Sequence, residues 1–183
     1  LGNLIDFLTP KYHKKIEDDF TSLVKIIIGQ QLSGSAAKTI VSRVEKCLNT
    51  KTFNPQNIIS LCNNNLRNCG ISHSKINYIK NLSQILLDQP EYFVKLRYKN
   101  ENEVLQELCK IKGIGVWTAS IFAMGTLGHE NIFPYGDASI NKAIKLIYPD
   151  ETSQENIISK WSPYKSFACR VLWQWVDNGM KPF

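Results

Sequence analysis

The sequence predicts an all-α protein, and three observations point to this fold class. Apolar residues recur every three or four positions along nearly the whole chain, which is the spacing of one face of an α-helix. Helix-start residues such as Ser and Asn, and helix-stop glycines, separate these stretches at short intervals. No stretch alternates apolar and polar residues for long enough to form a strand. We therefore expect short helices, about ten of them.

The helices in the first half of the chain follow from apolar positions separated by caps and breakers. The apolar positions lie, in chain order, at Phe20–Ile27, Ala37–Leu48, Ile58–Leu61, Ile76–Leu86 and Tyr92–Leu96. The separating signals are Ser33-Gly34-Ser35, Asn54-Pro55, Gly70, Ser72 or Ser74, and Pro90. A cap followed by Pro at the first helical position is a typical helix start, and Gly is a typical end.

The second half of the chain holds a composite segment at residues 101–142. It reads as a helix, a tight hairpin at residues 112–115 (KGIG), a helix opening at Val116, and a Gly- and Pro-marked loop that ends at Asp137. Beyond it, residues 152–155 (TSQE) predict a capping box. A last helix is expected to start at Ser162-Pro163 and to stop at Gly179.

Composition indicates a globular chain with an affinity for anions. The 183 residues are 43% hydrophobic and 21% charged, which suits a packed core. The net charge of +6 favours an acidic partner such as nucleic acid, although many mildly basic proteins bind nothing acidic. The longest apolar run, from Leu23 to Ile28, contains Lys25 and is too short to cross a membrane, so no membrane association is expected.

Cysteine usage and the chain ends set further expectations. The five cysteines are scattered and form no C-x-x-C pair, so neither a zinc site nor an iron–sulfur cluster is expected. Thiols of this kind are typical of a reducing compartment, so we expect an intracellular protein of a nucleus or of a bacterial nucleoid and cytoplasm. The chain does not begin with Met, so we expect it to be part of a longer one. The sequence shows no further amphipathic surface that would need a partner subunit, so a monomer is expected.

The hairpin at residues 112–115 admits two interpretations. Two glycines between apolar helices suit a tight turn that needs a positive φ and binds nothing. The helix that opens at Val116, however, lacks a side-chain cap, so its first amides have no partner in the helix. Such amides suit a phosphate oxygen, and Lys110 and Lys112 add positive charge beside them. The second interpretation predicts contact with nucleic acid that does not depend on its base sequence.

Three separated motifs resemble one known family. Residues 108–119 (LCKIKGIGVWTA) followed by Gly136-Asp137 resemble the helix–hairpin–helix plus Gly/Pro-rich loop and Asp signature of the HhH-GPD DNA glycosylases. Residues 28–33 (IGQQLS) and 161–168 (WSPYKSFA) are similar to the alkylation-repair branch, the 3-methyladenine DNA glycosylase II (AlkA-type) enzymes. The resemblance runs from about Phe20 to the C-terminus and is specific because the three motifs stand in the family's order.

The resemblance implies a fold of two helical subdomains with the active-site cleft between them. One subdomain would span residues 20–127, with the helix–hairpin–helix at about 101–127, and the other would join residues 1–19 to 128–183 and carry Asp137. No cofactor would be required. Some members of the superfamily hold a cation on carbonyl groups of the hairpin, and the matching positions for such a structural monovalent cation are Cys109, Ile111 and Ile114.

Asp137 is the candidate catalytic residue. Taken alone, an Asp at this place is most simply an N-cap of the helix that begins at Ala138. The resemblance adds a role, because a carboxylate can stabilise the oxocarbenium character that develops on deoxyribose during N-glycosidic cleavage, or can activate the attacking water. Relatives that also cut the DNA strand carry a Schiff-base lysine where this chain has Trp117, so the resemblance implies base release without lyase activity. Lys112 and Lys142 do not occupy the matching position.

The resemblance also assigns residues to the base pocket and to DNA. The pocket would be lined by Trp117, Trp175, Gln30 and Tyr164, with Trp173 a weaker candidate. Aromatic rings attract a cationic alkylated purine, although most aromatic residues in any chain belong to the core. Ile121 and Ala138 stand where some AlkA-type enzymes place pocket tyrosines. Contacts with DNA would come from Gln31 as the wedge that fills the gap left by a flipped base, and from Ser72, His73, Lys75, Lys112, Gly113, Gly115 and Val116.

Three functions therefore remain open at this stage. The first is a monofunctional glycosylase that excises alkylated purines, chiefly 3-methyladenine, from double-stranded DNA in base excision repair. The second is a glycosylase for oxidised or mismatched bases that also has lyase activity, which the tryptophan at position 117 and the missing cysteine cluster disfavour. The third is a helix–hairpin–helix DNA-binding module without catalysis, which would have no use for Asp137.

Overall fold

The structure, a computed structural model, describes residues 1–8 and 18–181, in which helices are joined by turns and loops. All its regular elements there are helices, which confirms the all-α prediction. These residues divide into two compact units, one formed by residues 18–127 and the other by residues 1–8 together with 128–181. Residues 9–17, which we assigned to the second subdomain, lie outside the described residues. None of the described helices is long and apolar enough to cross a lipid bilayer.

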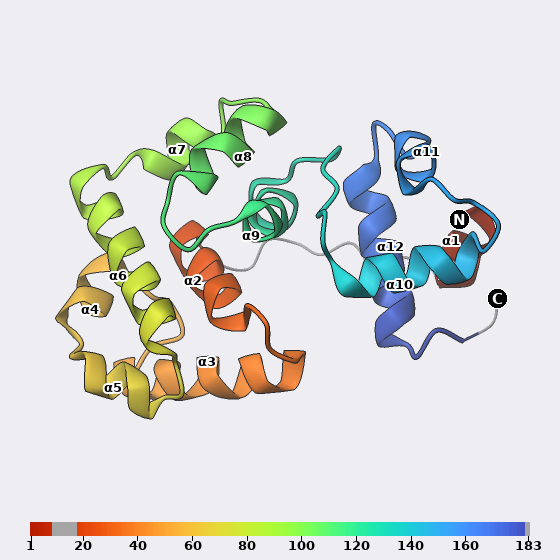
Figure 1. The fold of residues 1–183 in the computed structure, drawn as a ribbon. Helices are drawn as coiled ribbons and strands as arrows, with labels where there is room; N and C mark the ends of the chain where they lie inside the picture. The colour runs from red at the N-terminus through yellow and green to blue at the C-terminus, as the bar shows by residue number, and fades with distance from the viewer. Residues whose placement is uncertain (9–17, 182–183) are drawn as a thin grey trace. The chain divides into compact units, whose positions relative to one another are not determined.

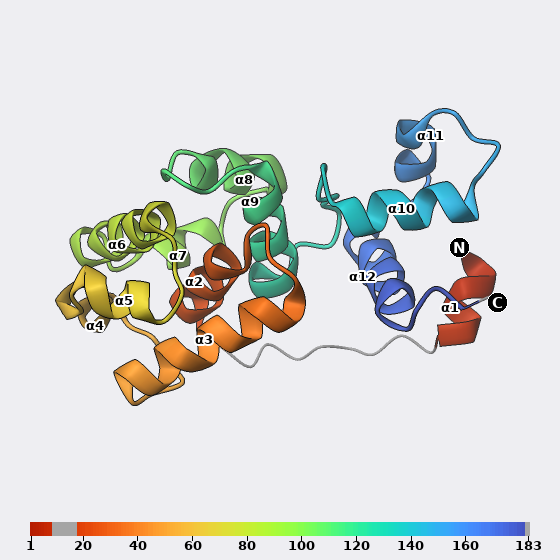
Figure 2. The same cartoon turned by 60° about the horizontal axis from the view of Figure 1, so that its bottom comes forward.

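The first unit is built around helix α2 (Asp19–Gly29), which is apolar on most of its surface. Its buried side chains include Leu23, Val24, Ile27 and Ile28, none more than 1% exposed. A helix that is apolar nearly all round must be surrounded by other helices. Accordingly α2 packs against α3 (Gly34–Leu48), α6 (His73–Asp88) and α9 (Val116–Phe122), which lie on different sides of it in Figures 1 and 2.

The remaining helices of this unit are short, and four of the five pack on α6 or α9. They are α4 (Pro55–Ser60), α5 (Asn63–Asn68), α7 (Tyr92–Leu96), α8 (Glu101–Cys109) and the π-helix η1 (Ala123–Leu127). Helices α4 and α5 pack on α6, whereas α8 and η1 pack on α9. The expected caps hold two of these helix starts, because the side chains of Asn54 and Ser72 accept hydrogen bonds from the first turns of α4 and α6.

Buried polar groups on α2 fix its neighbours. The hydroxyl of Thr21 accepts a hydrogen bond from the amide of Phe53 at 2.8 Å and donates to the carbonyl of the same residue at 3.2 Å. Both bonds are buried, so neither group is left unpaired in the core. At the next residue of α2, the hydroxyl of Ser22 forms a hydrogen bond with the hydroxyl of Thr126 in η1 at 2.5 Å. These contacts set where α2 lies against the chain on two sides.

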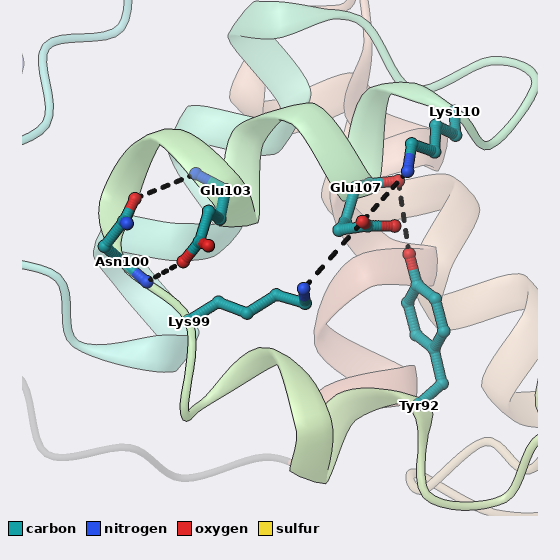
Figure 3. A network of polar contacts seen from close by, with 6 residues as sticks. All are labelled: Tyr92, Lys99, Asn100, Glu103, Glu107 and Lys110. Carbon is teal, nitrogen blue, oxygen red and sulfur yellow. Dashed lines mark hydrogen bonds and ion pairs between the residues drawn. The ribbon is translucent and has the colours of Figure 1, made fainter.

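A surface network positions α8, the helix that leads into the hairpin (Figure 3). The carboxylate of Glu107 accepts a hydrogen bond from the Lys110 ammonium at 2.9 Å and lies 3.9 Å from that of Lys99. The bond from Lys110 is the main cause that lowers the pKa of Glu107. The hydroxyl of Tyr92 donates to the Glu107 backbone carbonyl at 3.3 Å, so α7 is tied to the last turn of α8.

The second unit consists of α1 (Gly2–Leu8), α10 (Ala138–Ile147), α11 (Gln154–Ser159) and α12 (Lys165–Asp177). Helix α12 is its central element and packs against both α10 and α1. It buries Ala168, Cys169, Val171, Leu172 and Trp175, all at most 5% exposed. The loop from Gly128 to Asp137 leads into α10 and therefore decides where that helix begins.

Four local details differ from the sequence expectations. The capping box expected at residues 152–155 does not form, because Ser153 caps α11 and the Glu155 carboxylate accepts a bond from the Tyr135 hydroxyl instead. A capping box forms at Asn100 and Glu103, where no signal was noted. Helix α12 begins two residues beyond Pro163, at Lys165. Helix α1 and the π-helix η1 were not expected.

We predict that Tyr92→Phe reduces the loss of stability that the protein suffers in alkali. Burial and the nearby Glu107 charge raise the pKa of Tyr92 from 10.0 to about 12. Between these two pH values the unfolded chain ionises this phenol and the folded protein does not, so the folded state loses relative stability as pH rises. Melting temperatures from circular dichroism across this range measure the effect.

The control for this comparison is Tyr98→Phe, because the Tyr98 side chain follows the same helix and is 88% exposed. The melting temperature of Tyr98→Phe should depend on pH in the same way as that of the wild type. Parallel curves for Tyr92→Phe and the wild type would show that the raised pKa of Tyr92 contributes nothing to stability.

Candidate active site and DNA-binding hairpin

The hairpin at residues 112–115 forms as the glycine pattern predicts. Gly113 has φ +93°, the left-handed region that glycine favours, and the amide of Ile114 donates to the carbonyl of Ile111 at 3.0 Å. Gly115 is the N-cap of α9 and offers no side-chain cap, as expected from the sequence. The hairpin therefore delivers the first amides of α9 to the surface beside Lys112 and Val116, which are exposed.

Gly113 is required for a second reason besides its φ angle. A Cβ atom built at this position would lie 2.1 Å from Cγ of Tyr78, whose ring comes from α6. Real Cβ atoms do not approach ring carbons so closely, so no other residue fits without moving the ring. At Gly115 a Cβ would meet no atom within 4 Å. The two glycines thus differ, because Gly113 is fixed by packing and Gly115 leaves open space above the start of α9.

Gln30, expected in the base pocket or near the strand, is bonded to the hairpin. Its side-chain Nε2 donates to the carbonyl of Gly113 and to the hydroxyl of Thr118, each at 2.9 Å. It follows the last residue of α2, so these bonds join the end of α2 to both the hairpin and α9. The sequence could not distinguish this use of the amide from a contact with DNA, because both need an exposed helix end.

Lys75, expected to bind a phosphate, is also used inside the protein. Its Nζ donates to the carbonyl of Ile28 at 2.8 Å and to that of Gln30 at 2.7 Å. Partial burial lowers the pKa of Lys75. The ammonium therefore serves the carbonyl end of α2, where a cation is favoured by the helix dipole.

The remaining predicted DNA contacts are exposed. Gln31 has a backbone φ of +55°, uncommon for a residue with a side chain, and its side chain is exposed at the corner between α2 and α3. Ser72 is the N-cap of α6, with its hydroxyl accepting from the Lys75 amide at 3.4 Å, and His73 is exposed beside it. Their predicted contacts with DNA stay predictions.

The three positions predicted for a cation lie around the same hairpin. Cys109 ends α8 and is exposed, whereas Ile111 and Ile114 are 4% exposed. The carbonyl of Ile111 already accepts the hydrogen bond from Ile114. A carbonyl has two lone pairs, so this bond leaves the chemistry of the proposed donor set intact.

Asp137 is the N-cap of α10 and is buried, with 8% of its surface exposed. Its Oδ1 accepts a hydrogen bond from the Ile140 amide at 2.9 Å and another from Nε1 of Trp173 at 3.3 Å. The loop before it is fixed on α12, because the Ser166 hydroxyl accepts from the Ile132 amide at 3.1 Å. The carboxylate is thus both a helix cap and a rigidly held charge.

A buried thiol lies behind this carboxylate. Cys169 is fully buried on α12, one turn before Trp173. Burial above all, and the negative charge of Asp137 in addition, raise the pKa of the Cys169 thiol. The thiol therefore stays neutral at physiological pH and adds no charge beside Asp137.

The two tryptophans near the end of α12, both candidates for the base pocket, have different surroundings. Trp175 is 5% exposed and its Nε1 donates to the Lys181 carbonyl at 2.7 Å, so it belongs to the interior. Trp173, the weaker candidate, is half-buried and bonds Asp137. Successive residues turn by about 100° around a helix, so side chains two apart point nearly opposite ways. Tyr164, which precedes α12, is 60% exposed.

The predicted pocket residues are distributed over both units. Trp117, half-buried on α9, and Gln30 lie in the unit of residues 18–127, whereas Asp137 and the residues of α12 lie in the other. A shared pocket between the units, and the cleft that the resemblance implies, stay predictions.

Comparison with known proteins identifies relatives of this arrangement. The sequence pattern of the HhH-GPD superfamily base excision DNA repair proteins matches residues 24–162. DNA-3-methyladenine glycosylase 1 of Schizosaccharomyces pombe is 25% identical over 182 residues, which are 95% of this chain and 79% of that protein. The crystal structure of a DNA-3-methyladenine glycosidase from Bacillus halodurans is 30% identical, with a TM-score of 0.77 over 90% of this chain and 78% of that one.

A further relative, YfjP of Bacillus subtilis (strain 168), is 27% identical over 169 residues. This match covers 86% of the chain but only 59% of YfjP. The chain therefore spans little more than half of some curated relatives and most of others.

We predict that Gly113→Ala lowers the free energy of unfolding by at least about 2 kcal/mol. The new methyl group would need both an unfavourable φ and a displaced Tyr78 ring. Urea unfolding followed by circular dichroism measures the change.

Gly115→Ala is the matched control, two residues away in the same turn. It has φ −90° and open space for a methyl group, so its stability should stay within about 0.5 kcal/mol of the wild type. Equal losses for both variants would mean that the contact with Tyr78 does not fix the hairpin.

Proposed function

The chain belongs to the HhH-GPD superfamily of base excision DNA repair proteins, and on that premise we propose that it is a monofunctional DNA glycosylase. Its substrates are alkylated purines, chiefly 3-methyladenine, in double-stranded DNA. Two relatives whose names state activity on 3-methyladenine, and which align with most of this chain, support the choice of lesion. The reaction is hydrolysis of the N-glycosidic bond, which releases the base and leaves an abasic site.

The observation that carries this proposal is the environment of Asp137. The carboxylate is buried, yet it is held by an amide and an indole N–H on the same oxygen, Oδ1. A fixed negative charge in a region shielded from water stabilises a developing positive charge more strongly than a solvated one does. Positive charge develops on deoxyribose as the glycosidic bond breaks. Asp137 stabilises that charge or activates the attacking water.

The leaving group needs little help in this reaction. An alkylated purine already carries a positive charge and departs as a neutral base, so a strong general acid is not required. Rings of Trp117 and Trp173 favour such a cationic base over a normal one, by about 0.5–2 kcal/mol per ring. Trp173 takes the place that the sequence analysis gave to Trp175. Tyr164 is a further candidate for the same contact.

DNA is held through its backbone by the hairpin. The amides at the start of α9 and the exposed Lys112 offer a phosphate both hydrogen bonds and positive charge. Gln31 enters the duplex where the damaged base has been flipped out. No cofactor takes part, and a monovalent cation on the carbonyls of Cys109, Ile111 and Ile114 would be structural. The protein acts as a monomer.

We predict that Asp137→Asn lowers the single-turnover rate of 3-methyladenine release at least about 100-fold. Asn caps helices as well as Asp does, so α10 should begin at the same residue while the charge is lost. The rate is measured by chromatography of bases released from methylated duplex DNA. An unchanged melting temperature and an unchanged affinity for DNA are the controls. A variant that excises at the wild-type rate would exclude Asp137 from the chemistry.

We further predict that borohydride does not trap the protein on DNA. A Schiff base needs a lysine, and the position that carries it in bifunctional relatives holds Trp117. The measurement is denaturing gel electrophoresis after incubation with alkylated DNA and sodium borohydride. Trp117→Lys is the useful comparison, since it restores an amine at that position. A stable crosslink with the wild-type chain would refute the monofunctional assignment.

A further inference from the structure

The corner between α2 and α3 has an uncommon backbone conformation at Gln31, and Lys75 is bonded to the residues before it. Gln31 has φ +55°, a left-handed conformation that is unfavourable for a residue with a side chain. Directly before it, the carbonyls of Ile28 and Gln30 both accept hydrogen bonds from Nζ of Lys75. Lys75 thus holds the backbone directly before Gln31, because it bonds the carbonyl of the peptide that joins Gln30 to Gln31.

We propose that Lys75 is a positioning residue for base flipping, which holds Gln31 in the conformation that enters the duplex. This inference rests on the proposed function, because it concerns how a glycosylase opens DNA. It assigns Lys75 no contact with phosphate, unlike the sequence analysis.

The bonding of Lys75 supports this role over a phosphate contact. The last carbonyls of a helix have no partner within it, and an ammonium group satisfies them and complements the helix dipole. Two of the three hydrogens of the Lys75 ammonium are directed to such carbonyls, at 2.8 and 2.7 Å. Lys75 is half-buried, and this burial lowers the pKa of its ammonium group. A lysine available to a phosphate group is exposed instead, as Lys112 is.

The corner is also fixed from its other side. Nε2 of Gln30 donates to the Gly113 carbonyl and to the Thr118 hydroxyl, both at 2.9 Å. Gln30 therefore receives a bond from Lys75 at its backbone and gives two bonds through its side chain. These hydrogen bonds join the corner, the hairpin, the first part of α9 and the N-terminal part of α6 into one polar network of five residues: Ile28, Gln30, Lys75, Gly113 and Thr118. Removing the Lys75 charge frees two carbonyls and lets Gln31 relax toward an ordinary backbone conformation.

The same helix offers a matched control. Lys80, five residues further along α6, is half-buried and donates to the carbonyl of Leu61, the C-cap of α4, at 2.8 Å. Lys80→Met therefore removes the same kind of contact, an ammonium on a helix-end carbonyl, at the end of α4 rather than of α2. Any general loss of stability from deleting such a contact should appear in both variants.

The measured quantity is how much more tightly the protein binds a duplex that lacks one base than an intact duplex. Affinities are measured by fluorescence anisotropy for two duplexes of one sequence, one undamaged and one carrying a tetrahydrofuran abasic analogue. The ratio of interest is the affinity for the abasic duplex divided by the affinity for the undamaged one. We expect Lys75→Met to lower this ratio about tenfold. Binding to the undamaged duplex should stay within about twofold of the wild type, and Lys80→Met should leave the ratio unchanged.

A double-mutant cycle then tests whether Lys75 acts through Gln31. Gln31→Ala alone should lower the ratio by a similar factor, and adding Lys75→Met to it should lower the ratio no further. Additive losses would show that the two residues act separately and would overturn the proposal. If Lys75→Met melts too early for the assay, Lys75→Gln keeps a neutral donor and should show the same pattern with a smaller loss.

Two other outcomes also contradict the inference. Equal weakening on both duplexes, with a reduced dependence on salt, would make Lys75 a phosphate contact. The same loss of ratio in Lys80→Met would make the effect one of stability. Failure of the proposed function itself looks different: the wild-type chain would then release no base from methylated DNA, whatever the binding ratios of the variants.

Discussion

The carbonyl end of α2 is the constraint on which the first unit depends. Helix α2 packs against α3, α6 and α9, so the last carbonyls of α2 need hydrogen-bond donors from neighbouring elements. Lys75 of α6 donates to two of these carbonyls, and the side chain of Gln30 donates to Gly113 and to Thr118 of α9. A break in this chain of bonds would disturb the hairpin and the corner of Gln31 together, although they lie more than 80 residues apart in the sequence.

The second unit solves a different problem, that of holding a charge without water. Asp137 caps α10, and the indole of Trp173 fixes its carboxylate from α12. Ser166, near the start of the same helix, holds the loop that leads to Asp137. One helix thus controls both the path of the loop and the orientation of the carboxylate, while the neutral Cys169 thiol adds no competing charge. The two units divide the work that we propose, since one holds DNA and the other supplies the carboxylate.

The sequence predicted these features unevenly, for physical reasons that particular residues illustrate. Helices and most caps were predicted because periodicity and caps are local, and the hairpin because Gly113 needs a conformation that few residues adopt. The uses of Lys75 and Gln30 were not, because their partners are backbone carbonyls distant in sequence, which carry no residue signature. The resemblance pointed to Trp175 rather than Trp173, and the bond between the Trp173 indole and Asp137 joins residues 36 apart in the sequence, which no local pattern marks. The start of α12 lies two residues beyond Pro163, which no local signal marked either.

The central claim is that this chain both binds DNA and breaks the N-glycosidic bond of alkylated purines. It is tested most directly by incubating the purified protein with duplex DNA treated with a methylating agent and separating the released bases by chromatography. We expect 3-methyladenine as the main product, with strands that break only after alkali treatment of the abasic sites. Tight binding of this DNA without release of any base would contradict the account and identify the chain as a helix–hairpin–helix binding module.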